Sequence, residues 1–186
     1  CRSSSDVVGL LHSDDEFASP SVLARIAERF CDARVDIVYG DLQYVTPTGN
    51  VIRQWRSRPF APGLLAVGWM PPHPTMFVRR SVFDRIGTYD ATYRVSGDYE
   101  LILRLFREFG ARSVYLPTVI TRMTTGGASN RDLRQVVRKS REDIRAMRSN
   151  RVCPLLALPL KNGQKLWQFA RAAASRDTTS RKSSAS

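Results

Sequence analysis

Short apolar runs alternate with amphipathic stretches over the first 125 residues of the chain. The run at 7–11 lies between polar ends and predicts a buried strand of the kind found in parallel sheets. Ser19 and Pro20 suit the N-cap and the first position of a helix. Its expected apolar face consists of Val22, Leu23, Ile26, Ala27 and Phe30.

The middle of the chain predicts short strands and one long irregular segment. A strand is expected at 35–39, closed by Gly40, and the segments 43–45 and 51–55 are expected to pair as a hairpin. Proline recurs through 59–74, which predicts an ordered loop without regular structure.

A strand at 75–78 and a helix at 81–86, ended by Gly87, are expected next. A second amphipathic helix begins at Ser96 and Gly97. Its apolar face is expected to comprise Leu101, Ile102, Leu105, Phe106 and Phe109.

Two more strands, at 113–116 and 119–123, are expected around Pro117. They precede a basic helix at 132–149, an amphipathic helix at 165–174 and a disordered polar end. Because strands alternate with helices, the fold class predicted is α/β.

The composition fits one compact domain with an appendage. The 186 residues are 42% hydrophobic and 25% charged, and no apolar run of about 18 residues could span a membrane. The cysteines at positions 1, 31 and 153 form no zinc-ligand cluster and suit free thiols in a reducing compartment. We therefore expect a cytoplasmic protein.

Positive charge is concentrated near the C-terminus. Of the net charge of +12, residues 1–130 contribute 15 basic and 13 acidic side chains, and residues 131–186 contribute 14 and 4. This difference predicts a domain over 1–130 and a basic amphipathic helical tail over 131–186. Such a tail favours anionic phospholipid or nucleic acid. The alternative is a solvated arginine-rich helix with no specific partner.

Two groups of carboxylates are candidates for chemistry. Asp14 and Asp15 follow an apolar strand, where adjacent carboxylates could hold a divalent cation and leave room for diphosphate oxygens. The alternative is a solvated turn. Asp98 lies at a helix start, where the helix dipole favours its anion, and could act as a general base toward a hydroxyl. The alternative is that Asp98 or Ser96 caps the helix.

The proline-rich loop offers a third candidate. Prolines on both sides of His73 fix its backbone, so its side chain could touch an acceptor or a phosphate. Trp69 in the same loop and Glu100 in the following helix are further candidates for contacts with the acceptor or substrate. The alternatives are packing in the loop and, for Glu100, a place in the first turn of a capped helix.

The order of these motifs resembles the second half of a family 2 glycosyltransferase of the GT-A fold, most closely the bacterial enzymes that build exopolysaccharide, capsule or O-antigen. The resemblance covers about residues 7–130. The segments that carry it are 11–15, 39–41, 73–80, 86–90 and 97–105. It implies an incomplete GT-A domain, a Rossmann-like mixed sheet flanked by helices.

The resemblance also implies roles for single residues. Asp15 would be the main ligand of a Mg²⁺ or Mn²⁺ ion that bridges the diphosphate of a nucleotide sugar, most commonly a UDP-sugar, and Asp14 would lie beside it. Asp98 would be the base that deprotonates the acceptor hydroxyl during an inverting transfer. The sequence departs from the family at Ser13, where the first acidic position of the metal motif is not acidic, and at Gly97, where many relatives have Glu.

The first half of such a domain, with the strands that hold the donor's base and ribose, has no counterpart in the sequence. We therefore expect a truncated enzyme, aggregation-prone and inactive by itself, with an unpaired sheet edge at 7–11. Acceptors of this family are saccharides, often lipid-linked. The basic tail could therefore dock on the inner face of the plasma membrane through Leu155, Leu156, Leu158, Leu160, Leu166, Trp167 and Phe169.

Three other interpretations of the function remain possible. The sequence pI near 10.5 is typical of a nucleic-acid-binding module, although the basic residues are confined to one segment and residues 1–130 carry no known DNA or RNA motif. A metal-dependent phosphohydrolase could use Asp14, Asp15 and Asp98, although a two-metal site needs more ligands and the chain has two histidines. A catalytically dead remnant is the third.

Overall fold

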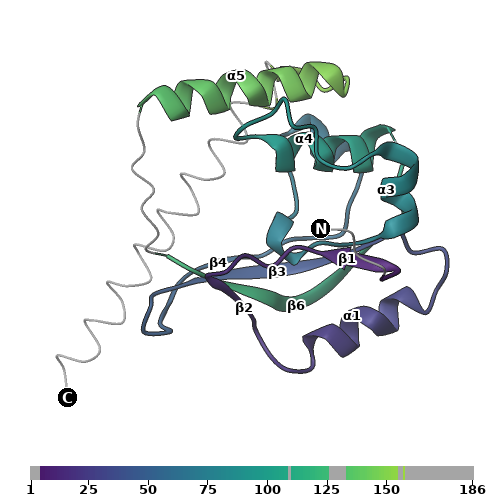
Figure 1. Cartoon of the computed structure of the whole chain (residues 1–186), viewed down its shortest axis with the longest axis vertical. Helices are drawn as coiled ribbons and strands as arrows, with labels where there is room; N and C mark the ends of the chain where they lie inside the picture. Colours follow the sequence, from purple (N-terminus) through teal and green to yellow (C-terminus); the bar gives the residue numbers. More distant parts are fainter. Residues whose placement is uncertain (1–4, 109, 126–132, 155–156, 158–186) are drawn as a thin grey trace.

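Two neighbouring parallel strands organise the structure, a computed structural model that describes residues 5–108, 110–125, 133–154 and 157. They belong to a six-stranded sheet whose other pairings are antiparallel, so the sheet is mixed (Figure 1). The strands in order across it are β1 (Val7–Gly9), β5 (Phe77–Arg79), β3 (Ile37–Val45), β6 (Ser113–Thr124) and β2 (Asp15–Phe17), and β4 (Val51–Trp55) also pairs with β3. The predicted α/β class is confirmed.

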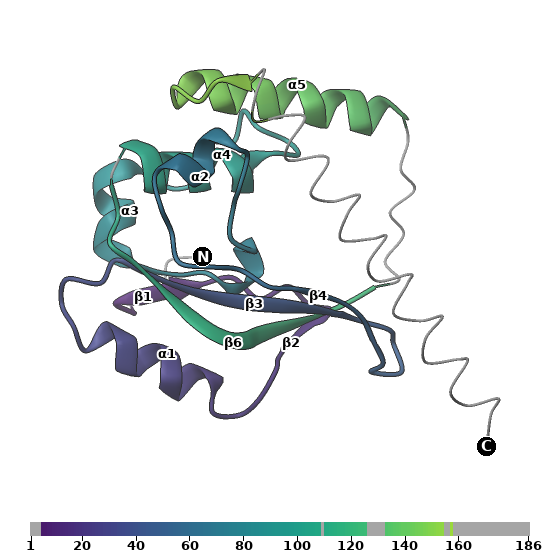
Figure 2. The ribbon, with the colours of Figure 1, turned by 180° about the vertical axis from the view of Figure 1, so that it is seen from behind.

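Helices cover both faces of the sheet. Helix α1 (Val22–Phe30) lies on one face, whereas α2 (Gly63–Ala66), α3 (Arg80–Ile86), α4 (Gly97–Leu103) and α5 (Leu133–Ser149) lie over the other (Figure 2). Neighbouring residues of β3 point to opposite faces. Val38 packs in the core with α1, and Ile37 and Tyr39 pack in the larger core on the side of α4.

The strand expected at 7–11 is shorter and less buried than predicted. Only 7–9 form β1, and that strand lies at the edge of the sheet, antiparallel to β5. Leu10 and Leu11 are 45% and 41% exposed because the chain leaves the sheet after Gly9. The prediction of a buried strand in a parallel sheet was wrong, since β1 has a neighbour on one side only.

Strands β3 and β6 continue through residues that predicted breaks. The pairing register between them shifts beside Gly40, and a Cβ atom there would lie 2.7 Å from the carbonyl oxygen of Thr118. Glycine therefore permits the close approach of β6, and Pro117 lies within the irregularity. The hairpin of β3 with β4 is confirmed.

The predicted helices agree with the structure better than the predicted strands do. Helix α1 begins at Val22 rather than Pro20, and Leu23 is 48% exposed, outside the buried face. Helix α3 ends at Gly87, whose φ of 78° favours glycine. Helix α4 continues as the π-helical turn η2 (Arg104–Glu108). Phe109 lies outside the described residues.

The expected loop at 59–74 is irregular apart from α2 and the start of the 3-10 turn η1 (His73–Thr75). The strand after it begins at Phe77 instead of residue 75.

The predicted basic helix is α5, which packs on α4 (Figure 1). Its Ala146 and Met147 are fully buried and belong to the larger core. The helix expected at 165–174, the polar end and the apolar tail residues beyond 154 lie outside the described residues, and the division at residue 130 stays a prediction. No helix in the described ranges is long and apolar enough to cross a membrane.

Candidate functional site

Asp98 and His73 lie in direct contact. Asp98 is the second residue of α4, and its Oδ2 atom is 3.2 Å from Nδ1 of His73. Both side chains are 29% exposed, so the pair is partly enclosed and still open to a substrate. The structure thus brings together two residues that sequence reasoning selected separately.

The turn that carries His73 is fixed to the sheet by buried hydroxyl groups. The hydroxyl of Thr75 donates to the carbonyl oxygen of Pro72 at 2.8 Å and accepts from the backbone N–H of Gly40 at 3.3 Å. The hydroxyl of Thr121 on β6 donates to the carbonyl oxygen of Pro74 at 2.9 Å. Both threonines are fully buried. These bonds and the two prolines hold the imidazole of His73 in place.

His12 joins the same cluster from the chain segment after β1. Its ring meets that of His73 edge to face, with 5.8 Å between centroids. His12 was not selected as a separate site residue from the sequence. The signal was its place three residues before Asp15, whose backbone N–H donates to the carbonyl oxygen of His12.

Asp15 is the first residue of β2, a strand that the sequence did not predict because it is short and begins with two acidic residues. Burial raises the pKa of Asp15, an effect that the neighbouring His12 and His73 oppose and Asp14 reinforces. Its Oδ2 atom is enclosed and has no hydrogen-bond partner among the described residues.

Asp14 is exposed, and its carboxylate accepts a hydrogen bond from the hydroxyl of Ser13 at 2.8 Å. The two adjacent aspartates therefore have different surroundings. Asp15 lies within electrostatic range of both histidines, whereas Asp14 is accessible to solvent.

Burial lowers the pKa of His73, an effect that the charges of Asp98 and Asp15 oppose and His12 reinforces. The imidazole is therefore mainly neutral at pH 7, where one of its ring nitrogens donates and the other accepts. Tyr89 lies within electrostatic range of this cluster: partial desolvation and then the charge of Asp98 raise its pKa, although the residue is 49% exposed. It belongs to the segment 86–90 and is a second residue that sequence reasoning did not select.

Trp69 does not join the cluster. Its side chain is 5% exposed and packs in the larger core against Phe60, Tyr39 and Phe106, with ring centroids about 6 Å apart. Of the two interpretations of this residue, the structure supports packing.

Glu100 does not join it either. Its carboxylate forms a two-point ion pair with Arg104, with N–O distances of 2.9 and 2.8 Å. Arg104 also donates to the carbonyl oxygens of Ile86, the last residue of α3, and of Thr88 just after it. Glu100 therefore positions an arginine that caps the C-terminal end of the neighbouring helix α3.

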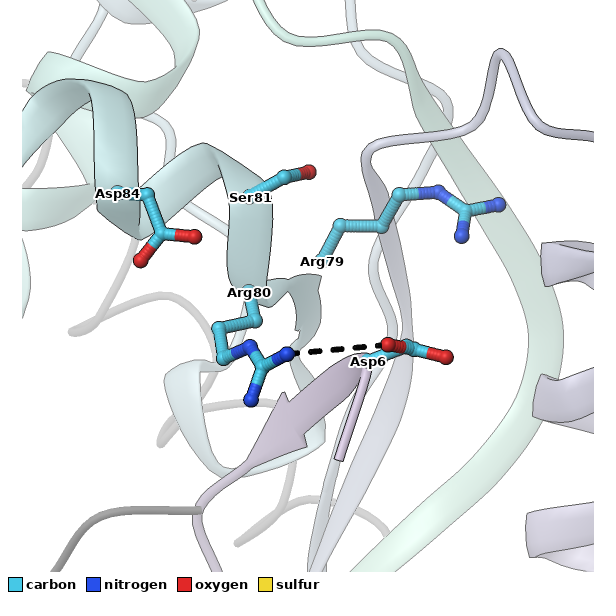
Figure 3. A pocket seen from close by; sticks show the side chains of 5 residues that line it. All are labelled: Asp6, Arg79, Arg80, Ser81 and Asp84. Atoms are coloured by element: carbon cyan, nitrogen blue, oxygen red, sulfur yellow. Dashed lines mark ion pairs between the residues drawn. The ribbon is translucent and has the colours of Figure 1, made fainter. Parts of the chain in front are cut away.

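A separate recess lies where β1 and β5 meet α3, and none of the predicted site residues lines it (Figure 3). Arg80 approaches Asp6 there at 4.0 Å. The guanidinium of Arg79 points away from both and donates to the carbonyl oxygens of Phe30 and Val35. The recess is thus lined by charged side chains, among which Arg80 pairs with Asp6, the residue before β1.

Whether a divalent cation fits this cluster depends on which side-chain oxygen atoms are available to bind it. No group of three or more His, Cys, Asp or Glu side chains in the described ranges is arranged to hold a metal ion by itself. Asp15 does offer an enclosed oxygen without a partner, and Asp14 offers an exposed carboxylate. Both are hard ligands suited to Mg²⁺ or Mn²⁺. These residues fit a cation whose remaining ligands come from a substrate.

Comparison with known proteins does not assign this chain to a family. No family model matches the chain, and no curated protein is similar to it in sequence. The functional interpretation therefore rests on the cluster formed by Asp98, His73, His12 and Asp15.

Proposed function

We propose that this chain is part of an inverting glycosyltransferase of the GT-A type. It would move a sugar from a nucleoside diphosphate donor, a UDP-sugar in the first instance, to a hydroxyl group in bacterial exopolysaccharide, capsule or O-antigen synthesis. The observation that carries the proposal is the contact of Asp98 with His73, in a cluster that also contains Asp15.

In this proposal Asp98 is the general base. Its carboxylate takes the proton of the acceptor hydroxyl while the hydroxyl oxygen forms a bond to the anomeric carbon of the donor sugar. The bond between that carbon and the diphosphate oxygen breaks on the opposite side, and the nucleoside diphosphate leaves with the bonding electrons. Attack and departure on opposite sides invert the anomeric configuration.

Two features of Asp98 suit this role. Its partial exposure leaves room for an acceptor hydroxyl. Neutral His73 can donate a hydrogen bond to one carboxylate oxygen and so orient the other.

A Mg²⁺ or Mn²⁺ ion would be held by Asp15, with Asp14 beside it. Such an ion stabilises the negative charge of a departing diphosphate. The enclosed, unpartnered oxygen of Asp15 supports this assignment.

Charge on α5 supports a lipid-linked acceptor. Arg138, Arg141, Arg145 and Arg148 recur at helical spacing, and all four are exposed. Basic side chains near an anionic leaflet contribute about 1 kcal/mol each to membrane binding. In this proposal the protein is peripheral on the inner face of the plasma membrane.

Glycosyl transfer is tested with the full-length product of the reading frame, a panel of nucleotide sugars, Mn²⁺ and bacterial lipid extract. The readouts are release of nucleoside diphosphate and transfer of radiolabelled sugar. We expect Asp98→Asn to lower transfer by roughly 10²- to 10⁴-fold, the range for loss of a general base. Glu28→Gln, on the exposed side of α1, is the matched control. Full activity of Asp98→Asn would contradict the proposal.

A metal-dependent phosphohydrolase is the second candidate, because both histidines of the chain lie at the cluster. Release of inorganic phosphate from a nucleotide or sugar phosphate, measured without any acceptor, distinguishes it. A hydrolase would release phosphate there, whereas a transferase would transfer the radiolabelled sugar only when an acceptor is present.

A further inference from the structure

The segment that leads into α4 is held from outside by α5. The Oε2 atom of Glu142 accepts hydrogen bonds from the backbone N–H groups of Val95 and Ser96, at 2.8 and 2.9 Å. Ser96 is the N-cap residue of α4 and is fully buried, and its side chain makes no capping bond to the helix. Its hydroxyl donates instead to the carbonyl oxygen of Lys139 on α5, at 3.4 Å.

A second side chain of α5 contacts the same segment. The guanidinium of Arg145 lies over the ring of Tyr93, 4.6 Å from its centroid, and donates to the hydroxyl of Thr92 at 3.0 Å. Burial disfavours the charge of Glu142, but backbone hydrogen bonds from Val95, Ser96 and Arg94, together with the charge of Arg138, lower its pKa. Glu142 is therefore an anion at neutral pH and forms charge-assisted bonds.

These contacts end two residues before Asp98. Only Gly97 stands between Ser96 and Asp98, so a displacement of Ser96 moves the start of α4 and with it the carboxylate. The 3.2 Å contact with His73 would not survive a movement of about 1 Å, which is also enough to impair a reacting geometry. The opposite partner, His73, is fixed independently by β3 and β6.

We propose that Glu142 is a positioning residue, which acts through the backbone N–H groups of Val95 and Ser96 to keep Asp98 beside His73. The geometric part concerns the side chains of Glu142, Asp98 and His73 alone, and only its effect on transfer rests on the proposed function. Helix α5 then belongs to the support of the site, although the sequence assigned it to a tail.

The geometric part is tested by NMR on the full chain without metal, because two histidines give separable imidazole signals. Asp98 raises the pKa of His73 by its charge, so Asp98→Asn should lower the titration midpoint of His73. We expect Glu142→Ala to lower it in the same direction and Glu142→Gln to lower it less. Glu142 bonds to the backbone N–H groups of Val95 and Ser96, so we expect the shift to pass through the segment at 95–98.

Amide hydrogen exchange gives a second readout of the same proposal. Exchange at Val95 and Ser96 should become roughly tenfold faster in Glu142→Gln, since bonds to a charged acceptor are being weakened. Glu28→Gln should change neither the exchange nor the titration. An unaltered midpoint of His73 together with unaltered exchange in Glu142→Gln would overturn the proposal.

The catalytic consequence is measured separately. In the active protein Glu142→Gln should lower kcat and leave KM for the donor unchanged, and Glu142→Asp should recover part of the loss. If transfer is absent altogether, the proposed function fails, while NMR and exchange still decide whether Glu142 positions Asp98. A rise in KM with unchanged kcat would contradict the positioning role.

Discussion

The hydroxyl of Thr121 donates a hydrogen bond to the carbonyl oxygen of Pro74 at 2.9 Å, so strand β6 holds the turn that presents His73. The bond is fully buried. It joins a residue of the sheet centre to a loop residue next to the candidate site. Rigid presentation of His73 therefore depends on a side chain far from it in the sequence.

Thr121→Val removes this bond and keeps nearly the same shape. The carbonyl oxygen of Pro74 then loses a buried partner, which costs about 1–3 kcal/mol in the free energy of unfolding. Urea denaturation of both proteins measures the difference. Thr118→Val is the control, since the hydroxyl of Thr118 accepts a solvent-exposed hydrogen bond from Arg25. An equal loss of unfolding free energy in the two variants would contradict a stabilising role for the bond from Thr121 to Pro74.

The ion pair of Glu100 with Arg104 is predicted to stabilise the fold. Side-chain exposure is 9% and 17%, and breaking a buried pair typically costs about 3–5 kcal/mol. We therefore expect Arg104→Met to lower the free energy of unfolding by about 3 kcal/mol in urea denaturation. Arg34→Met, which breaks an exposed pair with Asp32, should lower it far less. A small loss for Arg104→Met would return Glu100 to the candidates for substrate contact.

Stability should depend on pH through His73. Because the native pKa of His73 lies below its ordinary value, the unfolded chain binds the proton first as the pH falls. Stability is therefore lost from about pH 6.5 down to the native pKa, and is constant below it. We expect the Tm of the wild type to fall more between pH 7.5 and 5.5 than that of His73→Asn, by thermal unfolding. A steeper fall in the variant would contradict this sign.

Local periodicity predicted where helices α1, α4 and α5 lie and was insufficient for the sheet. Helix α1 buries Val22, Ile26 and Phe30 on one face, as its spacing predicts, whereas α4 buries every residue from 99 to 103 and is therefore enclosed on more than one face. Gly40 and Pro117 predict breaks when read singly. They instead lie at one irregularity where β3 and β6 pair, and only knowledge of that pairing explains both residues.

The candidate site was partly predictable for the same reason. The order of motifs selected Asp15, His73 and Asp98, but no local pattern states that Asp98 and His73 touch or that His12 lies against His73. Trp69 illustrates the converse. Whether an aromatic residue in a loop faces a substrate or a core depends here on Phe60 in the same loop and on Tyr39 and Phe106 from two other parts of the chain.

Asp15→Asn distinguishes an enzyme from a nucleic-acid-binding module. If Asp15 holds a cation that stabilises the leaving diphosphate, the substitution should lower sugar transfer roughly 100-fold or more. Binding to nucleic acid, measured by filter retention, should not change, since Asp15 lies in the cluster and not on the basic helix. Unchanged transfer would remove the metal assignment. Altered nucleic-acid binding would favour the module.

The exposed arginines of α5 predict binding to anionic membranes. Arg138, Arg141 and Arg148 are exposed on the helix surface, away from buried Ala146 and Met147. At about 1 kcal/mol each, replacing all three by Gln should weaken binding to phosphatidylglycerol vesicles roughly 100-fold at low salt. Vesicle sedimentation with the full chain measures this.

Two controls separate charge from other causes of sedimentation. Phosphatidylcholine vesicles carry no net charge, so they should retain neither the wild type nor the triple variant. Binding of the wild type should also weaken as salt is added, because screening shortens the reach of surface charge to about 8 Å at physiological ionic strength. Retention that is independent of salt and of the three arginines would contradict a membrane role for α5. It would leave the helix with the role that its inward face supports, which is to hold the segment before Asp98 through Glu142.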